Sequence, residues 1–150
     1  MILRIKRFFE KHFQPVETKT DIEHRLKLAT TALLIEMMRA DLDASEQEKT
    51  RLREILATHF KLDDAEIENT LAEASKENRD AADYYQFTSV INEHYSQDQK
   101  IQLVEQLWQL AWADGYIDRF EEHLVRTLAD LLHVPHGRFI QAKHRVLGTE

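Results

Sequence analysis

The chain has no cysteine, and only 3 glycines and 2 prolines occur among its 150 residues. The absence of cysteine excludes disulfide bonds, thiolate zinc sites and cysteine nucleophiles. Many-stranded sandwiches and barrels need frequent glycine and proline turns, so this composition argues against them. No apolar run approaches the ~20 residues that cross a bilayer, and the first residues lack the pattern of a secretory signal. We therefore expect a cytoplasmic protein.

Basic residues are also few, since 27 Asp and Glu face 20 Lys and Arg and the formal net charge is −7. The acidic excess is concentrated over residues 36–83, which hold 14 acidic and 7 basic residues. A nucleic-acid-binding protein needs the opposite sign of charge, so no nucleic acid partner is expected. The excess is typical of a solvated helix surface.

Five capping-box patterns divide the sequence, and each precedes apolar residues with helical spacing. They are Thr20–Glu23, Ser45–Glu48, Asp63–Glu66, Ser96–Gln99 and Asp118–Glu121. The sequence therefore predicts an all-α compact bundle of about seven to eight helices. The expected helices cover residues 2–13, 21–40, 46–60, 64–76, 80–95, 97–113, 119–132 and 136–147.

The sequence repeats itself at an offset of about 73 residues. Asp41 matches Asp114, and Ser45–Glu48 matches Asp118–Glu121, after which a one-residue slip extends the match. We expect two duplicated three-helix units to build the bundle.

The segment "LWQLAWADGYIDRFEEHLVRTLADLLHV", with "FTSVINEHYSQDQKIQLVEQ" before it, resembles the TerB-like tellurite-resistance family. The likeness covers about residues 20–147 and is strongest to its short stand-alone bacterial branch. It implies an all-helical bundle without known catalytic activity, linked to metal and chemical stress and to membrane-associated partners. We accordingly divide the chain into an N-terminal basic helix with its linker, 1–19, and a TerB-like domain, 20–150.

In that family, acidic residues of the turns are proposed cation ligands. The resemblance carries this role to Asp114, Asp118 and Glu121, and to Asp41 and Glu48 in the first repeat. Asp43 lies close to them, and Ser45 stands where the second acid of the first repeat would fall.

The position of Asp114 near the end of a predicted helix also calls for a physical explanation. A carboxylate at a helix C-terminus is disfavoured, because unpaired carbonyls already make that end negative. A hard cation such as Ca²⁺ or Mg²⁺ would relieve the repulsion. Backbone donors of the turn, an arginine or a partner protein are the alternatives. Gly115 as a left-handed residue and Asp118 with Glu121 as a capping box need no ligand.

Two further groups of residues favour structural roles. His123, His133, His136 and His144 lack the spacing of a zinc site and are expected at the surface. Trp108 and Trp112, one helical turn apart, are expected as core anchors, with a groove lining as the alternative.

The first residues, "MILRIKRFFEKHF", form an apolar stripe flanked by Arg4, Lys6, Arg7 and Lys11. Such a helix can pack on its own bundle, on a second copy in a homodimer, or on an anionic membrane surface.

These features together predict a non-catalytic interaction module of a bacterial stress-response or envelope-linked system. We expect a protein partner, a membrane-associated complex among the candidates, and a location in the cytoplasm or at the inner membrane's surface. A divalent cation in the acidic turns is the expected cofactor, if there is one. The alternatives are a small metal-dependent enzyme that uses the acidic turns and a peripheral membrane adaptor that uses the N-terminal helix.

Overall fold

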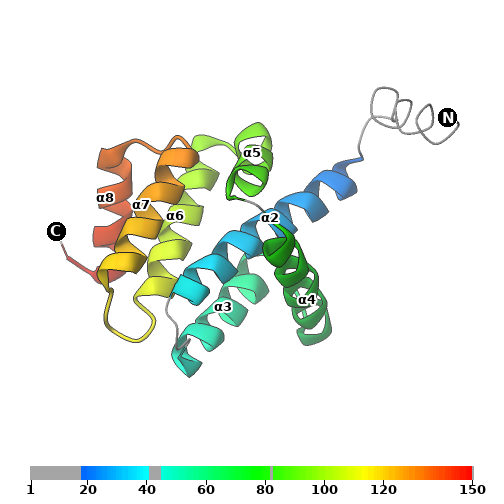
Figure 1. The fold of residues 1–150 in the computed structure, drawn as a ribbon, viewed down its shortest axis with the longest axis horizontal. Helices are drawn as coiled ribbons and strands as arrows, with labels where there is room; N and C mark the ends of the chain where they lie inside the picture. The colour runs from blue at the N-terminus through cyan, green and yellow to red at the C-terminus, as the bar shows by residue number, and fades with distance from the viewer. Residues whose placement is uncertain (1–17, 41–44, 82, 150) are drawn as a thin grey trace, which may run out of the picture.

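A computed structural model of the chain describes residues 18–40, 45–81 and 83–149 (Figure 1). Within these ranges the protein is built from α-helices without β-strands, which confirms the predicted fold class. The helices are α2 (Lys19–Ala40), α3 (Glu46–His59), α4 (Asp64–Asp80), α5 (Tyr85–His94), α6 (Gln97–Ala111), α7 (Arg119–Leu131) and α8 (His136–Leu147). The helix predicted over residues 2–13 lies outside the described residues, so the predicted division at residue 19 stays a prediction.

Capping bonds determine where most of the helices begin. Reciprocal capping boxes start α4, α6 and α7 at Asp63, Ser96 and Asp118, as predicted. α3 also begins as predicted, because Ser45 Oγ accepts from Glu48 N at 3.1 Å. Side chains within three residues of each other thus satisfy donors that a helix start leaves unpaired.

The capping box predicted at Thr20 is wrong. Thr18 and Asp21 exchange the two bonds instead, with Thr18 N donating to Asp21 Oδ2 at 3.3 Å and Asp21 N donating to Thr18 Oγ1 at 3.1 Å. An aspartate three residues after a threonine supplies the same acceptor as a glutamate would, so α2 begins at Lys19.

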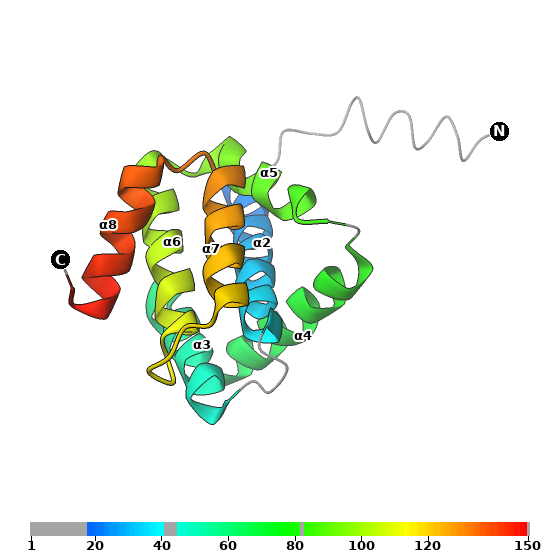
Figure 2. The same cartoon turned by 60° about the vertical axis from the view of Figure 1, so that its left-hand side comes forward.

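α2 and α6 form the centre of the bundle. Each contacts the other and helices on several sides, as the two views of the fold show (Figures 1 and 2). Their buried faces bring Leu33, Met37 and Trp108 out of contact with solvent, and Trp108 Nε1 donates to Phe139 O at 3.3 Å. Trp112 caps α6 and is 37% exposed, so the prediction of a core anchor holds for Trp108 only.

The two predicted three-helix units recur as α2–α3–α4 and α6–α7–α8. In each unit the third helix packs on the first, α4 on α2 and α8 on α6. The middle helices have 14 and 13 residues, and this difference accounts for the one-residue slip. Each is followed by a residue with left-handed backbone, Lys61 at φ 55° and His133 at φ 59°. The matching helix ends confirm the duplication.

The two units also pack against each other, since α3 packs on α6 and α7 packs on α2. The bundle therefore has two equivalent seams between units, α3–α6 and α7–α2. α5 has no counterpart in the repeat, and it packs on α2 and α7.

α4 is four residues longer than predicted, and a polar network at its end explains the extension. Asn78 is 8% exposed and donates through Nδ2 to Ala32 O at 3.2 Å and to Glu36 Oε2 at 2.8 Å. Its Oδ1 accepts from Arg39 Nη1. These bonds to α2 hold the last turn of α4 in helical form.

The length and polarity of the helices also bear on membrane crossing. None of the helices over residues 18–40, 45–81 and 83–149 is long and apolar enough to span a bilayer.

Candidate functional site at the acidic turns

The turn between α6 and α7 is a short hydrogen-bonded path. α6 ends at Ala111, and Gly115 N donates to Trp112 O at 2.8 Å. Gly115 has φ +82°, a conformation that strains residues with a Cβ, as expected for this glycine. This turn places Asp118 at the start of α7, where it is the N-cap residue.

Asp114 is exposed, and its carboxylate helps to shape the turn. Its Oδ1 accepts from Tyr116 N at 3.1 Å. Among the alternatives considered for this residue, the structure therefore shows the bond to a backbone donor of the turn. An ionised carboxylate has about four acceptor positions, so the bond leaves room for a cation or a partner's donor.

Asp118 and Glu121 form the predicted capping box. Glu121 N donates to Asp118 Oδ1 at 2.8 Å, and Asp118 N donates to Glu121 Oε1 at 3.2 Å. Glu121 is only 3% exposed, while Asp118 is partly buried. The positive end of the α7 macrodipole favours both carboxylates at this position.

The first repeat places a glutamate in the same way. Glu48 occupies the third position of α3, as Glu121 does in α7, and is 1% exposed. Its N–H is bonded to Ser45, which replaces the aspartate of the second repeat. Asp41 and Asp43, the other predicted ligands of this turn, lie outside the described residues.

The two turns lie at the same end of the bundle, where α2 ends and α3 begins beside the α6–α7 turn (Figures 1 and 2). A depression of about 380 Å³ joins them. It is lined by Glu46, Gln47, Thr50, Arg51 and Glu54 of α3 and by Ala113 of the α6–α7 turn. The start of α3 and the α6–α7 turn therefore share one surface depression.

The sequence of this helical bundle matches one known protein family. The family model described as "Tellurite resistance protein TerB" matches residues 27–144, more than three quarters of the chain and both acidic turns. The chain belongs to the TerB family. No curated protein and no solved structure matches it.

In this TerB-family chain, the acidic turns offer oxygen donors of the type that Ca²⁺ and Mg²⁺ prefer. Among residues 18–40, 45–81 and 83–149, however, no three His, Asp or Glu side chains gather closely enough to hold a metal ion. A cation at this end needs ligands from Asp41 or Asp43 together with Asp114 or Asp118. The six-residue ligand set therefore stays a prediction.

The candidate histidines were expected at the surface, and most lie there. His123, His133 and His136 are exposed, and His144 is partly buried with Nδ1 2.9 Å from Thr149 Oγ1. In the part of the chain that the structure describes, none belongs to a group suited to metal.

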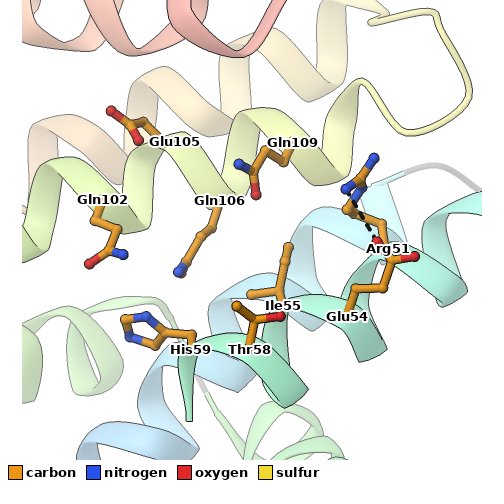
Figure 3. Close-up of a pocket in the computed structure, with 9 residues that line it drawn as sticks. All are labelled: Arg51, Glu54, Ile55, Thr58, His59, Gln102, Glu105, Gln106 and Gln109. Carbon is orange, nitrogen blue, oxygen red and sulfur yellow. Dashed lines mark ion pairs between the residues drawn. The ribbon is translucent and has the colours of Figure 1, made fainter. Parts of the chain in front are cut away.

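A polar groove runs along the α3–α6 seam, beside the acidic end (Figure 3). It has a volume of about 450 Å³ and shares Arg51 and Glu54 with the depression at the turns. Gln106 extends from α6 into this space toward His59 of α3, and burial lowers the pKa of His59. The remaining lining residues are Ile55, Thr58, Gln102, Glu105 and Gln109.

No short motif in the sequence predicts this groove. Arg51 and Glu54 form an ion pair at 3.2 Å, and such pairs three residues apart are common on any exposed helix. Gln106 is the unusual member, since it is 6% exposed and its Oε1 has no hydrogen-bond partner among the described residues. Only the packing of α3 on α6 makes that burial visible.

Proposed function

We propose that this TerB-family chain is a non-catalytic helical interaction module of a bacterial stress-response or envelope-linked system, and that its acidic end binds a divalent cation. The observation that carries the proposal is the pair of equivalent turns at one end of the bundle. Each is followed by a buried glutamate in the first turn of the next helix, Glu48 and Glu121. Two buried carboxylates at equivalent positions add negative charge to this end of the bundle, which would favour a divalent cation there.

The carboxylates of Asp114 and Asp118 also support a cation-binding role. Asp114 uses one described bond to a backbone donor, and Asp118 uses Oδ1 in the α7 cap. Both keep acceptor positions for a hard cation. A bound cation would reduce repulsion among the carboxylates and order the two turns together, which would change the surface offered to a partner.

The contacts of the acids also support a non-catalytic role. Asp118 and Glu121 hold the start of α7, and Asp114 holds the turn before it. A carboxylate engaged in holding the backbone is poorly placed to transfer protons to a substrate. Hydrolysis of a phosphoester or peptide that the Asp118→Asn variant loses would overturn this part of the proposal.

Thermal unfolding with and without Ca²⁺, Mg²⁺ or Mn²⁺ tests cation binding. A cation at a hundred times its dissociation constant stabilises the folded state by about 2.7 kcal/mol. We expect Asp114→Asn and Asp118→Asn to reduce this stabilisation, because each removes a charged oxygen ligand.

Asp63→Asn is the matched control for Asp118→Asn. The Asp63 capping box has the same 2.8 Å and 3.2 Å bonds, but it starts α4. Asn keeps the capping acceptor in both variants, so we expect the Asp63 variant to respond to cation as the parent does. A parent protein whose melting temperature ignores all three cations would remove the cation from the proposal.

The interaction role needs a separate test. Affinity capture from the native host, with and without divalent cation, should recover one defined complex whose yield depends on Asp114. Recovery that is identical for the Asp114→Asn variant would show that the partner does not use the acidic end.

A further inference from the structure

The second seam between the units is formed by α7 against α2 (Figure 2). A groove of its own lies along this seam. Its volume is about 340 Å³, and its walls combine one carboxylate with aromatic and apolar groups. The lining residues are Glu36, Tyr84, Phe120, His123, Leu124 and Thr127. None of them is a lysine or an arginine.

Glu36 supplies the charge of this groove. Its described hydrogen bond comes from a neutral donor, Asn78 Nδ2 at 2.8 Å, and the Tyr84 side chain lies close enough to feel its charge. No Lys, Arg or His of the described chain forms an ion pair with it, and the nearby guanidinium of Arg39 is bonded to Asn78 Oδ1. The groove therefore holds a partly buried carboxylate that is oriented by neutral groups and lacks a described counter-charge.

Aromatic side chains flank this carboxylate. Phe120 belongs to the first turn of α7 and is 78% exposed, although a phenylalanine gains free energy from burial. Tyr84 is partly buried, and burial together with the charge and hydrogen bond of Glu36 raises its pKa. The Tyr84 hydroxyl therefore keeps its proton over a wider pH range and remains a neutral group beside Glu36.

The equivalent seam shows that the fold does not require this chemistry. At the offset of the repeat, Gln109 stands in place of Glu36 and Gln47 stands in place of Phe120. Arg51 likewise takes the position of Leu124. Equivalent helix pairs thus make two different grooves. In the α3–α6 groove, which is rich in amides, Glu54 and Glu105 are paired with Arg51 and Arg145. The α2–α7 groove combines aromatic residues with the carboxylate of Glu36.

We propose that the α2–α7 groove binds an arginine side chain presented by a partner protein. A guanidinium is planar and weakly hydrated, so it stacks on aromatic rings and donates in a fork to a carboxylate. Phe120 and Glu36 offer those two features, and the net charge of −7 favours approach of a basic partner. A lysine ammonium lacks the planar face and loses more hydration on entry.

The inference rests on the proposed interaction role but uses a surface other than the cation-binding turns. The two proposals can therefore fail separately, the first in cation titrations and the second in arginine titrations.

Titration of the full chain with N-acetyl-arginine amide, followed by two-dimensional NMR, tests the groove. We expect shifts at amides of Glu36, Tyr84 and the first two turns of α7. The citrulline analogue has nearly the same shape without the charge, and the lysine analogue has the charge without the plane. Both should bind more weakly than the arginine compound.

Two variants copy the equivalent seam and serve as internal comparisons. Glu36→Gln keeps an acceptor for Asn78 but removes the charge, and we expect about tenfold or greater weakening. Phe120→Gln changes an exposed position, so the fold is retained while the stacking surface is lost and binding weakens. Gln47→Ala, in the other seam, should bind as the parent does.

Unchanged affinity in either groove variant, equal binding of the citrulline or lysine analogue, or shifts confined to the α3–α6 seam would overturn the proposal. Sedimentation of the unliganded chain tests whether a second copy of this chain occupies the groove instead. Self-association that Phe120→Gln abolishes would make a second copy of this chain the occupant and exclude the proposed partner.

Discussion

The first and second three-helix units share their helix ends and differ in the grooves beside them. Ser45 and Asp118 cap the middle helices. Lys61 and His133, which follow these helices, have the same left-handed backbone conformation. Between these ends, the outer faces of α3 and α7 have diverged, so that Gln47 of one corresponds to Phe120 of the other.

The difference shows which constraints a duplicated helical unit retains. Helix ends must satisfy backbone donors and acceptors that have no partner within the helix, so their chemistry persists. A groove residue such as Glu36 or Gln109 satisfies no such requirement. It can therefore change without leaving a backbone group at a helix end unpaired.

The largest expected effect compares how much buried residues of the central helices α6 and α2 contribute to the unfolding free energy. Trp108 and Ile35 are equivalent by the repeat and are 0% and 4% exposed. Trp108→Ala should cost about 3–5 kcal/mol of unfolding free energy, and Ile35→Ala should cost less within about 2–5 kcal/mol. Trp108 has more volume and also loses its bond to Phe139 O. Urea unfolding that ranks Ile35→Ala above Trp108→Ala would contradict this asymmetry.

A smaller effect separates the two N-caps. Asp118→Ala breaks a reciprocal box with bonds at 2.8 Å and 3.2 Å, whereas Ser45→Ala removes one described bond at 3.1 Å. Both losses should fall within about 0.5–2 kcal/mol, with Asp118→Ala the larger. The measurement is chemical denaturation without divalent cation. Equal losses would show that the reciprocal bond adds nothing.

The left-handed residues should behave alike if the units end in the same way. Lys61→Gly and His133→Gly place the residue that prefers φ near +60° at φ 55° and φ 59°. We expect each to raise the unfolding free energy by up to about 1 kcal/mol, because relief of strain outweighs the added freedom of the unfolded chain. Thr58→Gly, inside α3, is the control and should lose about 1 kcal/mol. A loss at Lys61 or His133 would contradict the expectation.

The smallest effect is a pH dependence confined to one unit. Burial lowers the pKa of His59 in the folded state below its ordinary value of about 6.5. Below that pH the unfolded chain binds more protons than the folded chain, so stability falls as pH decreases through the folded-state pKa. Leu131 occupies the equivalent position in α7.

His59→Leu should therefore remove part of the acid sensitivity. We expect its unfolding free energy, relative to that of the parent protein, to increase as the pH falls from 7 to 5. The measurement is urea unfolding at several pH values. A difference between the two proteins that is constant over this range would show that His59 does not titrate on unfolding.

Much of the fold could be read from short spacings. Asp63 with Glu66 and Ser96 with Gln99 start helices because their bonds join residues three apart in the chain. The error at Thr20 was equally local, since Thr18 and Asp21 offered a competing pair. Of the candidate site, the sequence located the α6–α7 turn, its left-handed Gly115 and the capping box that follows.

What the sequence by itself determined is therefore the class, most of the helix starts and the TerB family, because each depends on residues close together in the chain. Only the tertiary structure decided which faces meet. Glu36, Tyr84 and Phe120 share one groove although their separations in the chain follow no motif. Asn78 is buried only because α4 packs on α2, and Trp112 is exposed because its helix ends there. Such contacts arise from the packing of whole helices, to which every buried residue contributes, so no short spacing encodes them.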